Sequence, residues 1–381
     1  MKIVVAIDSF KGSLPSLKSG TAVKEAAERI FDEAFVEISP LADGGEGTVD
    51  AITSALGGEF VSACVKGPLS DRVSASYGLI KSTNTAVIEM SSAAGIMLLD
   101  NSALNPLYTD TYGVGELIKD ALSKSVRRFI IGIGGSATND GGVGMLKALG
   151  FQFLDKNGNP ISCGAIGLSE LAEIKTENAM PELADCEFLV ACDVKNPLCG
   201  EYGCSAIYGP QKGATPEMIL SMDSWLKKYA ALTKSIFPSA NELAEGAGAA
   251  GGMGFALMSY LGAKLRSGIE LVTSEIKLEE KIKSADLVVT GEGRLDSQSA
   301  MGKAPVGVAR LAKKYGKTVI AFSGCVAAGA ELCNENGIDA FFPILRSPTS
   351  LEVAMNVDNA YANLKATAEQ AFRLIKALTK W

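Results

Sequence analysis

The sequence contains no histidine, and this absence removes several kinds of active site. A Ser-His-Asp triad, a Cys-His pair and a His-Glu-x-x-His zinc site cannot be built without it. Acid–base chemistry must therefore use Asp, Glu, Lys, Tyr or Cys side chains. The 8 cysteines form no Cys-x-x-Cys pair and fit no zinc pattern. Scattered thiols in a chain of this size are usually reduced core residues.

The chain also lacks an excess of positive charge and any long apolar run. Its 36 Lys and Arg residues stand against 43 Asp and Glu residues, which gives a net charge of -7. Nucleic acid and anionic membranes are therefore not expected partners. The apolar run at residues 2–7 ends at Asp8 and is too short for a secretory or membrane segment. We expect a cytoplasmic protein.

What the sequence does contain is an alternation of short apolar runs and helical patterns, over 381 residues that suit two domains. Strands are predicted at 2–7, 35–41, 285–291, 317–324 and 339–345, and helices at 21–31, 48–56, 304–316 and 351–378. This α/β pattern predicts a doubly wound, flavodoxin- or Rossmann-like parallel-sheet domain formed by residues 1–60 and 280–381.

The middle of the chain has a different pattern. Three β-rich runs within residues 59–90 are joined by short turns and predict a β-meander, and residues 150–162 predict a hairpin that turns at 157–159. Residues 61–279 are therefore expected to form an inserted mixed α/β domain, with the active-site cleft between the two domains. Residues 139–153 also resemble residues 248–265, which indicates either two helix N-termini at one site or simply two closely packed helices.

Polar loops follow the first two predicted strands. Asp8 ends the strand 2–7 and is followed by Lys11, and Asp43 lies beside glycines after the second strand. A carboxylate at such a position can hold Mg²⁺ through water or accept a proton, and a lysine can bind a phosphate as a point charge. The alternative is that Asp8 only caps a loop. The Gly-x-Gly-x-x-Gly fingerprint of dinucleotide-binding proteins is missing here.

The segment 132–142 reads GIGGSATNDGG and lies between a predicted strand and a predicted helix. Successive backbone N–H groups and hydroxyls before a helix N-terminus form an anion-binding site. The alternative is that Asn139 or Asp140 only caps the helix. The residues expected to bind a phosphate or a substrate in this segment are Gly134, Gly135, Ser136, Thr138 and Asn139.

Two further loops carry charge. Asp193 follows the buried run at 187–190, and Lys212 lies between glycines in GPQKGA. The loop at residues 290–305 contains the most charged residues of these loops. It contains no Walker A motif, and the alternative to a binding site is a solvated loop without a ligand. Its charged residues are Glu292, Arg294, Asp296 and Lys303.

Acidic and basic loops with glycine-rich helix N-termini, in a chain without histidine, best suit phosphoryl transfer. Two alternatives stay open at this point. One is nicotinamide-dependent hydride transfer, which the missing fingerprint weakens. The other is a non-catalytic regulator that binds small acids, although several carboxylates near an anion site would repel an acid unless a metal intervened.

Seven segments, in order along the chain, resemble those of bacterial type-1 glycerate kinases. They read DSFKGS, PLADGGEGT, GGSATNDGG, ACDVKNPL, YGPQKGA, GAGAAGGMGFAL and TGEGRLD followed by GKAPVGVA. The resemblance implies transfer of the γ-phosphate of ATP to D-glycerate with Mg²⁺, in a two-domain α/β protein whose cleft closes on the substrate. The sequence leaves open whether the protein is a monomer or a homodimer. It favours 2-phosphoglycerate over 3-phosphoglycerate as the product.

Within this hypothesis the charged residues receive roles. Asp193 is expected to orient or deprotonate the attacking hydroxyl, with Asp8 as the second choice. The expected metal ligands, mostly through water, are Asp43, Asp296 and Glu292. The groups expected to bind a phosphate or the substrate carboxylate are the 134–139 loop, Lys11, Lys303, Arg294 in a bidentate contact and, as a weaker alternative, Arg72 in the GPLSDR turn.

Overall fold

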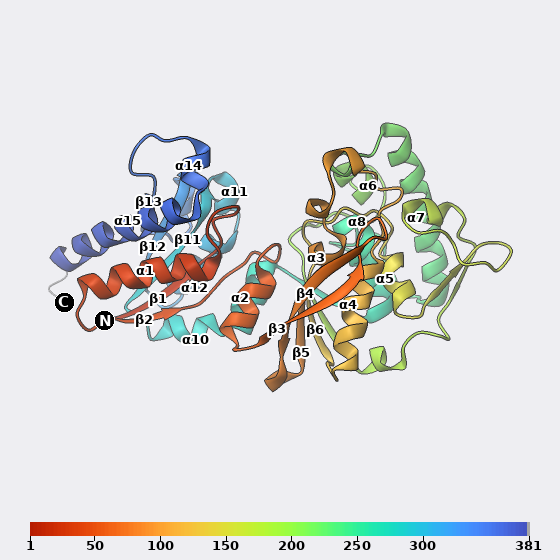
Figure 1. Cartoon of the computed structure of the whole chain (residues 1–381), viewed down its shortest axis with the longest axis horizontal. Coiled ribbons are helices and arrows are strands. Elements are labelled where there is room, and N and C mark those ends of the chain that lie inside the picture. Colours follow the sequence, from red (N-terminus) through yellow and green to blue (C-terminus); the bar gives the residue numbers. More distant parts are fainter. Residues whose placement is uncertain (379–381) are drawn as a thin grey trace. The chain divides into compact units, whose positions relative to one another are not determined.

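The computed structural model describes residues 1–378, and its contacts divide the chain into two units (Figure 1). Within the described residues, unit 1 contains residues 1–43, 50–56 and 269–378. Unit 2 contains residues 44–49 and 57–268. The sequence predicted domain junctions near residues 60 and 280, and in the structure the chain passes between the units after residues 56 and 268. Residues 44–49 also belong to unit 2, which the sequence did not predict.

Unit 1 is built on a five-stranded parallel sheet. Across the sheet the order is β13 (Ala340–Pro343), β12 (Thr318–Val326), β11 (Leu287–Leu295), β1 (Lys2–Ile7) and β2 (Phe35–Ile38). Counted along this unit, the order is 2-1-3-4-5, that of flavodoxin-like doubly wound folds. The central strands are nearly continuous apolar runs because both faces of such a sheet are buried. The predicted fold class is confirmed.

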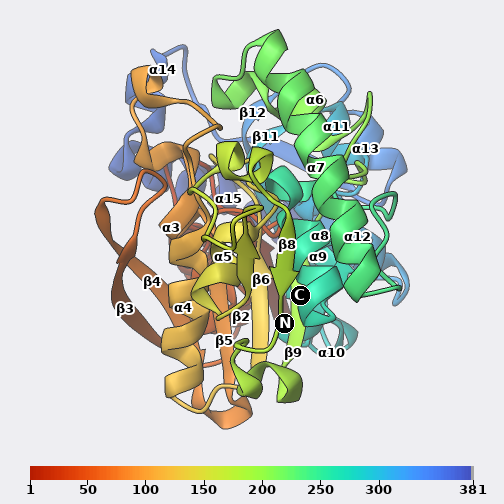
Figure 2. The same ribbon diagram turned by 90° about the vertical axis from the view of Figure 1, so that its right-hand side faces the viewer.

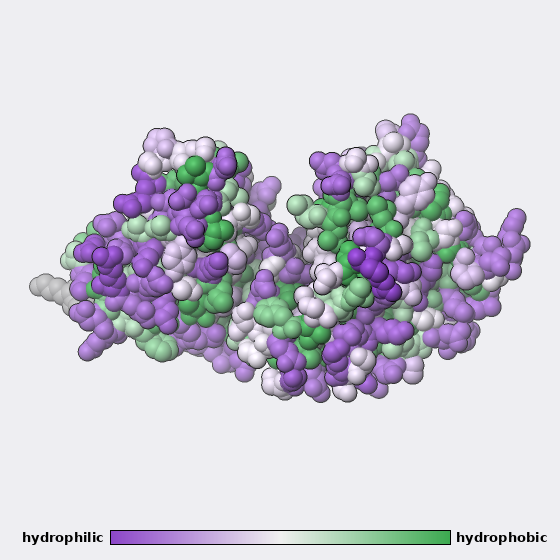
Figure 3. All heavy atoms as spheres, viewed as in Figure 1, coloured by the Kyte–Doolittle hydropathy of each residue, from purple (hydrophilic) through white to green (hydrophobic). Residues whose placement is uncertain are grey.

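Helices cover both faces of this sheet. α1 (Ser16–Ile30) and α15 (Val357–Leu378) pack together on one face, where Ala22, Ala26 and Ala368 are fully buried in the core. Their outer sides are largely hydrophilic (Figure 3). α12 (Ala304–Lys313) connects β11 to β12, which lie on the other side of β1 from β2. Because such crossovers are right-handed, α12 lies on the face opposite to α1.

Unit 2 contains a six-stranded mixed sheet. Its order is β10 (Lys264–Arg266), β9 (Glu187–Ala191), β6 (Arg128–Gly132), β5 (Thr85–Glu89), β4 (Arg72–Ile80) and β3 (Glu59–Lys66). β3, β4 and β5 form an antiparallel meander, as predicted, whereas β5, β6, β9 and β10 are parallel. The unit is therefore the mixed α/β domain that the sequence predicts.

The main helices of unit 2 are α4 (Tyr112–Ser123), α5 (Val143–Ala148), α7 (Pro216–Ile236) and α8 (Ala249–Leu261), and Figure 2 shows them from the side. An aromatic cluster joins three of the elements beside the sheet: Tyr229 of α7 contacts Phe255 and Tyr260 of α8 and Phe153 of β7 (Gln152–Leu154). Within residues 1–378, no helix is both long and apolar enough to cross a membrane.

The hairpin predicted at 150–162 forms as a short antiparallel pair. Leu154 and Pro160 form a bridge, and the N–H groups of Asp155 and Ile161 donate to the carbonyls of Asn159 at 2.8 Å and Phe153 at 3.0 Å. β7 also pairs with β8 (Glu173–Lys175), a partner that the sequence did not predict. The turn itself forms because the Asp155 carboxylate accepts the N–H groups of Asn157 and Asn159, each at 2.8 Å. A more distant strand is therefore added to the local pair.

The two similar glycine-rich segments pack against each other. The N–H of Gly141 donates to the carbonyl of Gly251 at 2.9 Å. A Cβ atom at Gly252 would lie only 2.8 Å from the Cα of Gly141, and at φ +94° it would also be strained. This contact supports the packing interpretation of the similarity.

Candidate functional site

The charged loops of unit 1 meet at the carboxyl ends of β1 and β11. The strand order reverses between these two strands, and open α/β sheets bind ligands at such a switch point. Ile7 pairs with Gly291, so Asp8 and Glu292 occupy the next positions on neighbouring strands. The N–H of Asp8 donates to the carbonyl of Gly291 at 2.9 Å, which fixes this end of β1.

Asp8 is the buried carboxylate of the site. Its exposed fraction is 3%, and its Oδ1 accepts the N–H of Ser9 at 2.6 Å. Burial, followed by the negative charges of Asp43 and Glu292, raises the pKa of Asp8 from 3.8 to about 7, against the lowering effects of Ser9 and Lys11. A carboxylate with this pKa is well suited to accept a proton near neutral pH.

Lys11 and Asp43 form an ion pair beside Asp8. The Lys11 Nζ lies 3.1 Å from the Asp43 Oδ2. Burial by itself would lower the pKa of Lys11, but Asp43, Asp8 and Glu292 together raise it. The lysine is therefore a permanent positive charge among three carboxylates.

The loop after β11 holds its own carboxylates in place. Asp296 caps the short helix α11 (Ser297–Ala300), since its Oδ1 accepts the N–H groups of Gln298 at 2.9 Å and Ser299 at 3.2 Å. The Ser299 hydroxyl donates to Glu292. Burial raises the pKa of Glu292, while Ser299 and Lys303 lower it. Much of the hydrogen-bonding capacity of Asp296 is thus used within the loop.

Arg294 and Lys303 add two cations. The Arg294 side chain is 66% exposed and its Nε lies 3.4 Å from the Asp296 Oδ2. Lys303 directly precedes α12, and its Nζ donates to Gln298 Oε1 at 3.1 Å. Both groups can turn toward an anionic ligand, because the contacts that hold them are few and partly exposed.

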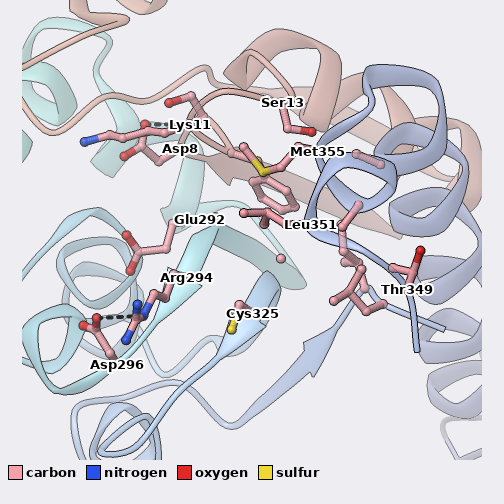
Figure 4. A pocket seen from close by; sticks show the side chains of 18 of the residues that line it. Asp8, Lys11, Ser13, Glu292, Arg294, Asp296, Cys325, Thr349, Leu351 and Met355 are labelled. Carbon is pink, nitrogen blue, oxygen red and sulfur yellow. Dashed lines mark hydrogen bonds and ion pairs between the residues drawn. The ribbon is translucent and has the colours of Figure 1, made fainter. Parts of the chain in front are cut away.

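These residues line one cavity of about 590 Å³ in unit 1. The predicted residues that the structure brings together there are Asp8, Lys11, Asp43, Glu292, Arg294, Asp296 and Lys303. Figure 4 shows most of their side chains on one side of the cavity, opposite Leu351 and Met355. The apolar side, which includes Ile344 and Leu345, was not predicted as part of a site.

The carboxylates of this cavity suit Mg²⁺ as a partner of bound phosphates rather than as a resident ion. The charges of Asp43 and Glu292 raise the pKa of Asp8, and the charge of Asp43 also raises the pKa of Glu292, so a further cation near these carboxylates would be favourable. Among the described residues, no three acidic or cysteine side chains converge closely enough to hold a metal ion by themselves. Mg²⁺ commonly takes one or two carboxylates and fills its remaining positions with water and phosphate.

The glycine-rich loop of unit 2 connects β6 to α5. Gly134 and Gly135 are exposed, and Ser136 is 8% exposed. Behind them lies Lys212, which is 1% exposed and donates from Nζ to Ser136 Oγ at 2.8 Å and to the carbonyl of Thr138 at 2.7 Å. Burial lowers the pKa of Lys212 to about 8. The ammonium group of Lys212, held by two neutral partners behind the exposed glycines, favours a negative group at the loop, and the charge of the buried Asp140 opposes part of this effect.

Asp140 organises the same loop from inside. Its carboxylate accepts hydrogen bonds from the backbone N–H and hydroxyl of Thr111 and from the N–H groups of Gly142 and Gly144. Burial and then the charge of Asp110 raise its pKa. The capping alternative therefore holds for Asp140, at the start of α5. It does not account for the exposed glycines.

Thr138 and Asn139 are fully buried behind the loop. The Asn139 amide donates to the Ser205 hydroxyl at 2.8 Å. Within the part of the chain that the structure describes, the Thr138 hydroxyl and the Asn139 carbonyl oxygen have no hydrogen-bond partner. Both residues therefore belong to the interior of unit 2 and not to its exposed surface.

Asp193 and Arg72 make contacts of their own within unit 2. Asp193 follows β9, is exposed, and accepts the N–H of Gly268 at 3.0 Å. Arg72 begins β4, pairs with Glu116 at 3.1 Å and donates to the carbonyl of Cys64 at 3.3 Å. The contact with Glu116 gives Arg72 a structural role without a ligand.

Sequence reasoning missed two parts of the site. It noted Lys212 between glycines but assigned it no role, because its burial and its contact with Ser136 depend on the fold. It took residues 351–378 as mainly helix, although a separate short helix, α14 (Leu351–Met355), stands at the cavity. No sequence signal indicated this part, because the exposure of Leu345 and Leu351 appears only in the structure.

A doubly wound unit with a charged cavity at its switch point defines a ligand-binding α/β protein, and comparison with known proteins gives its family. The model of the glycerate kinase family matches residues 3–376. The chain belongs to the glycerate kinase family, and it is a kinase. The glycerate kinase of Haemophilus influenzae is 45% identical over 375 residues, which cover 98% of this chain and 99% of that one.

Two further similar proteins are also described as glycerate kinases. The glycerate 2-kinase of Escherichia coli (strain K12) is 47% identical over 372 residues, covering 96% of this chain and 98% of that protein. A crystal structure provisionally assigned as glycerate kinase 2 from Salmonella typhimurium LT2 is 46% identical, with a TM-score of 0.92 and complete coverage of both chains.

Proposed function

We propose that this kinase transfers the γ-phosphoryl group of ATP to D-glycerate with the help of Mg²⁺, and that the product is 2-phosphoglycerate. The observation that carries the proposal is the unit 1 cavity, in which the buried Asp8 lies among Lys11, Arg294 and Lys303. Phosphoryl transfer requires positioning and charge neutralisation, which these residues can supply without histidine. The name of the Escherichia coli relative supports the 2-product.

Asp8 is the proposed acceptor of the hydroxyl proton. As the bond between the glycerate oxygen and the γ-phosphorus forms and the bond to ADP breaks, the proton passes to the Asp8 carboxylate. Lys11 and Arg294 neutralise charge on the phosphoryl oxygens. The Gly134–Ser136 loop, with Lys212 behind it, suits the carboxylate of an acid substrate. Buried Thr138 and Asn139 support this loop.

Mg²⁺ would supply further charge neutralisation on the phosphates, and the side chains that suit it are Asp43 and Glu292. Asp296 is the weaker of the three expected ligands, since it caps α11 and contacts Arg294. Asp193 is the alternative base. It is exposed, whereas Asp8 is buried with a pKa near neutrality, and this difference favours Asp8.

The test is an assay of the purified protein with ATP, Mg²⁺ and D-glycerate. We expect ADP release that needs both Mg²⁺ and D-glycerate, and a phosphorus NMR signal of 2-phosphoglycerate. A signal of 3-phosphoglycerate would overturn the regiochemistry alone. If other hydroxy acids release ADP and D-glycerate does not, the substrate assignment fails. The nicotinamide and non-catalytic alternatives lose their support, because the relatives are kinases.

A further inference from the structure

The unit 1 cavity has two chemically different halves. The charged half contains Asp8, Lys11 and Glu292, together with the loop after β11. The apolar half contains Leu351 and Met355 of α14, which Figure 4 shows opposite the charged side chains, and Phe10 is a further apolar lining residue. A cavity of this kind fits a ligand that is apolar at one end and charged at the other.

Glycerate does not need such a cavity. Each of its three carbons carries an oxygen, so an apolar wall offers it nothing and removes water from its polar groups. A cavity of about 590 Å³ is also large for such a small acid. A nucleotide matches both halves, because its base is planar and largely apolar on its faces and its phosphates are charged.

Given the proposed ATP-dependent reaction, on which this inference rests, we propose that the apolar half of the unit 1 cavity binds the purine base of the nucleotide. The base lies against Phe10, Leu351 and Met355, and the phosphates extend toward Lys11, Arg294 and Lys303. The nucleotide site is thereby assigned to unit 1, a choice that the sequence left open.

Apolar side chains of this half of the cavity are exposed to solvent. Leu351 is 77% exposed and Leu345 is 40% exposed, although both line the cavity. Covering such side chains contributes about 25 cal/mol for each Å² of apolar surface removed from water. A bound base would supply this cover, and the charged opposite half selects a base that carries phosphates.

Two glycines on neighbouring strands also line the cavity. They are Gly293 of β11 and Gly324 of β12. A Cβ atom at Gly324 would lie 2.6 Å from the carbonyl oxygen of Gly293, so this strand end must be glycine.

Cys325 offers a direct test, because it is exposed and lines the cavity next to Gly324. Cys64 and Cys163, in unit 2, are also exposed and serve as internal controls in the same sample. The full chain is alkylated with iodoacetamide, and the labelling rate of each cysteine is followed by peptide mass spectrometry. The additions are MgADP, adenosine, tripolyphosphate or D-glycerate.

With MgADP at about ten times its Kd, roughly one tenth of the sites are free, so labelling of Cys325 should slow roughly tenfold. Adenosine, which lacks phosphates, should also slow it, whereas tripolyphosphate and D-glycerate should not. Cys64 and Cys163 should react at unchanged rates. Unprotected Cys325 in a protein saturated with MgADP would overturn the assignment, as would protection by D-glycerate alone.

A pair of variants adds a kinetic test. Leu351→Glu places a charge in the apolar wall and should raise the KM for ATP roughly tenfold, an effect of about 1.4 kcal/mol, with the KM for D-glycerate unchanged. Leu374→Glu is the control, since Leu374 is exposed on α15 and does not line the cavity. A rise only in the KM for D-glycerate would place the acid substrate in this half instead.

The two proposals can fail separately. Release of ADP with D-glycerate, together with an unprotected Cys325, would keep the reaction and reject this nucleotide site. Protection of Cys325 by MgADP and adenosine without any turnover of D-glycerate would keep the site and reject the acceptor.

Discussion

Replacement of Asp8 by Asn should stabilise the protein at neutral pH while it removes activity. In the folded state the pKa of Asp8 rises from 3.8 to about 7, first because of burial. Between these two values the folded protein keeps a proton that the unfolded chain has released. The stability linked to this proton is complete below pH 3.8 and is lost as the pH rises through about 7. At about 1.4 kcal/mol per pKa unit, the loss is about 4 kcal/mol.

Asparagine stays neutral at every pH, and its side-chain oxygen can still accept the N–H of Ser9. The variant should therefore have a free energy of unfolding that exceeds the wild-type value by about 4 kcal/mol at pH 8, and by less than half of that at pH 5. Urea unfolding followed by circular dichroism at both pH values measures this difference. Asp32→Asn, at an exposed position of the same unit, is the matched control and should change neither value.

The same variant should lose at least about a hundredfold in kcat, since a base that accepts the hydroxyl proton contributes that much or more. A stability gain that is equal at pH 5 and pH 8 would refute the argument that Asp8 carries a buried, costly charge. A normal kcat in a variant that shows the expected stability gain would keep the electrostatic argument and remove Asp8 as the base.

Three further outcomes are expected. In the wild type, kcat/KM should rise with pH and level off above about pH 7, because Asp8 must lose its proton to act as a base; a profile that is flat from pH 5 to 9 would contradict this. Lys212→Met should raise the KM for D-glycerate at least roughly tenfold, because it removes the buried positive charge behind the loop, while Lys212→Arg keeps that charge and retains part of the affinity; equal losses in the KM for ATP would contradict the assignment of this loop to the acid. Glu292→Gln should raise the Mg²⁺ concentration needed for half-maximal activity, whereas Glu279→Gln, at an exposed position that contacts Tyr315, should not; a common shift in both would indicate a general charge effect.

The sequence alone predicted the local elements well. The runs at 2–7, 285–291 and 317–324 are buried strands because unbroken apolar runs suit a sheet that is covered on both faces. Their alternation with amphipathic helices was enough to predict the doubly wound fold. At 150–162 the predicted turn and its short local pairing are present, but the sequence did not predict that β7 also pairs with β8. Strand pairing depends on distant residues, which a local pattern does not contain.

The sequence also identified the charged residues of the unit 1 cavity, since Asp8, Lys11, Asp43 and the loop at 290–305 all follow strands. It could not tell that Asp8 and Glu292 are neighbours, because that follows from the 2-1-3 order of the sheet. Nor could it distinguish the buried Asp8 from the exposed Asp193 as a base. A pKa depends on the burial and charge around a group, and both are set by residues far away in the chain.

Residue types and local periodicity thus determined the fold class, the family resemblance and the list of polar loops. The tertiary structure alone decided the burial of Lys212 behind Ser136, the capping role of Asp296 and the apolar wall around α14. The physical reason is the same in each case. The burial of a residue and its distance from other residues are set when segments distant in sequence pack together. These two properties decide whether a charged or apolar residue belongs to a site.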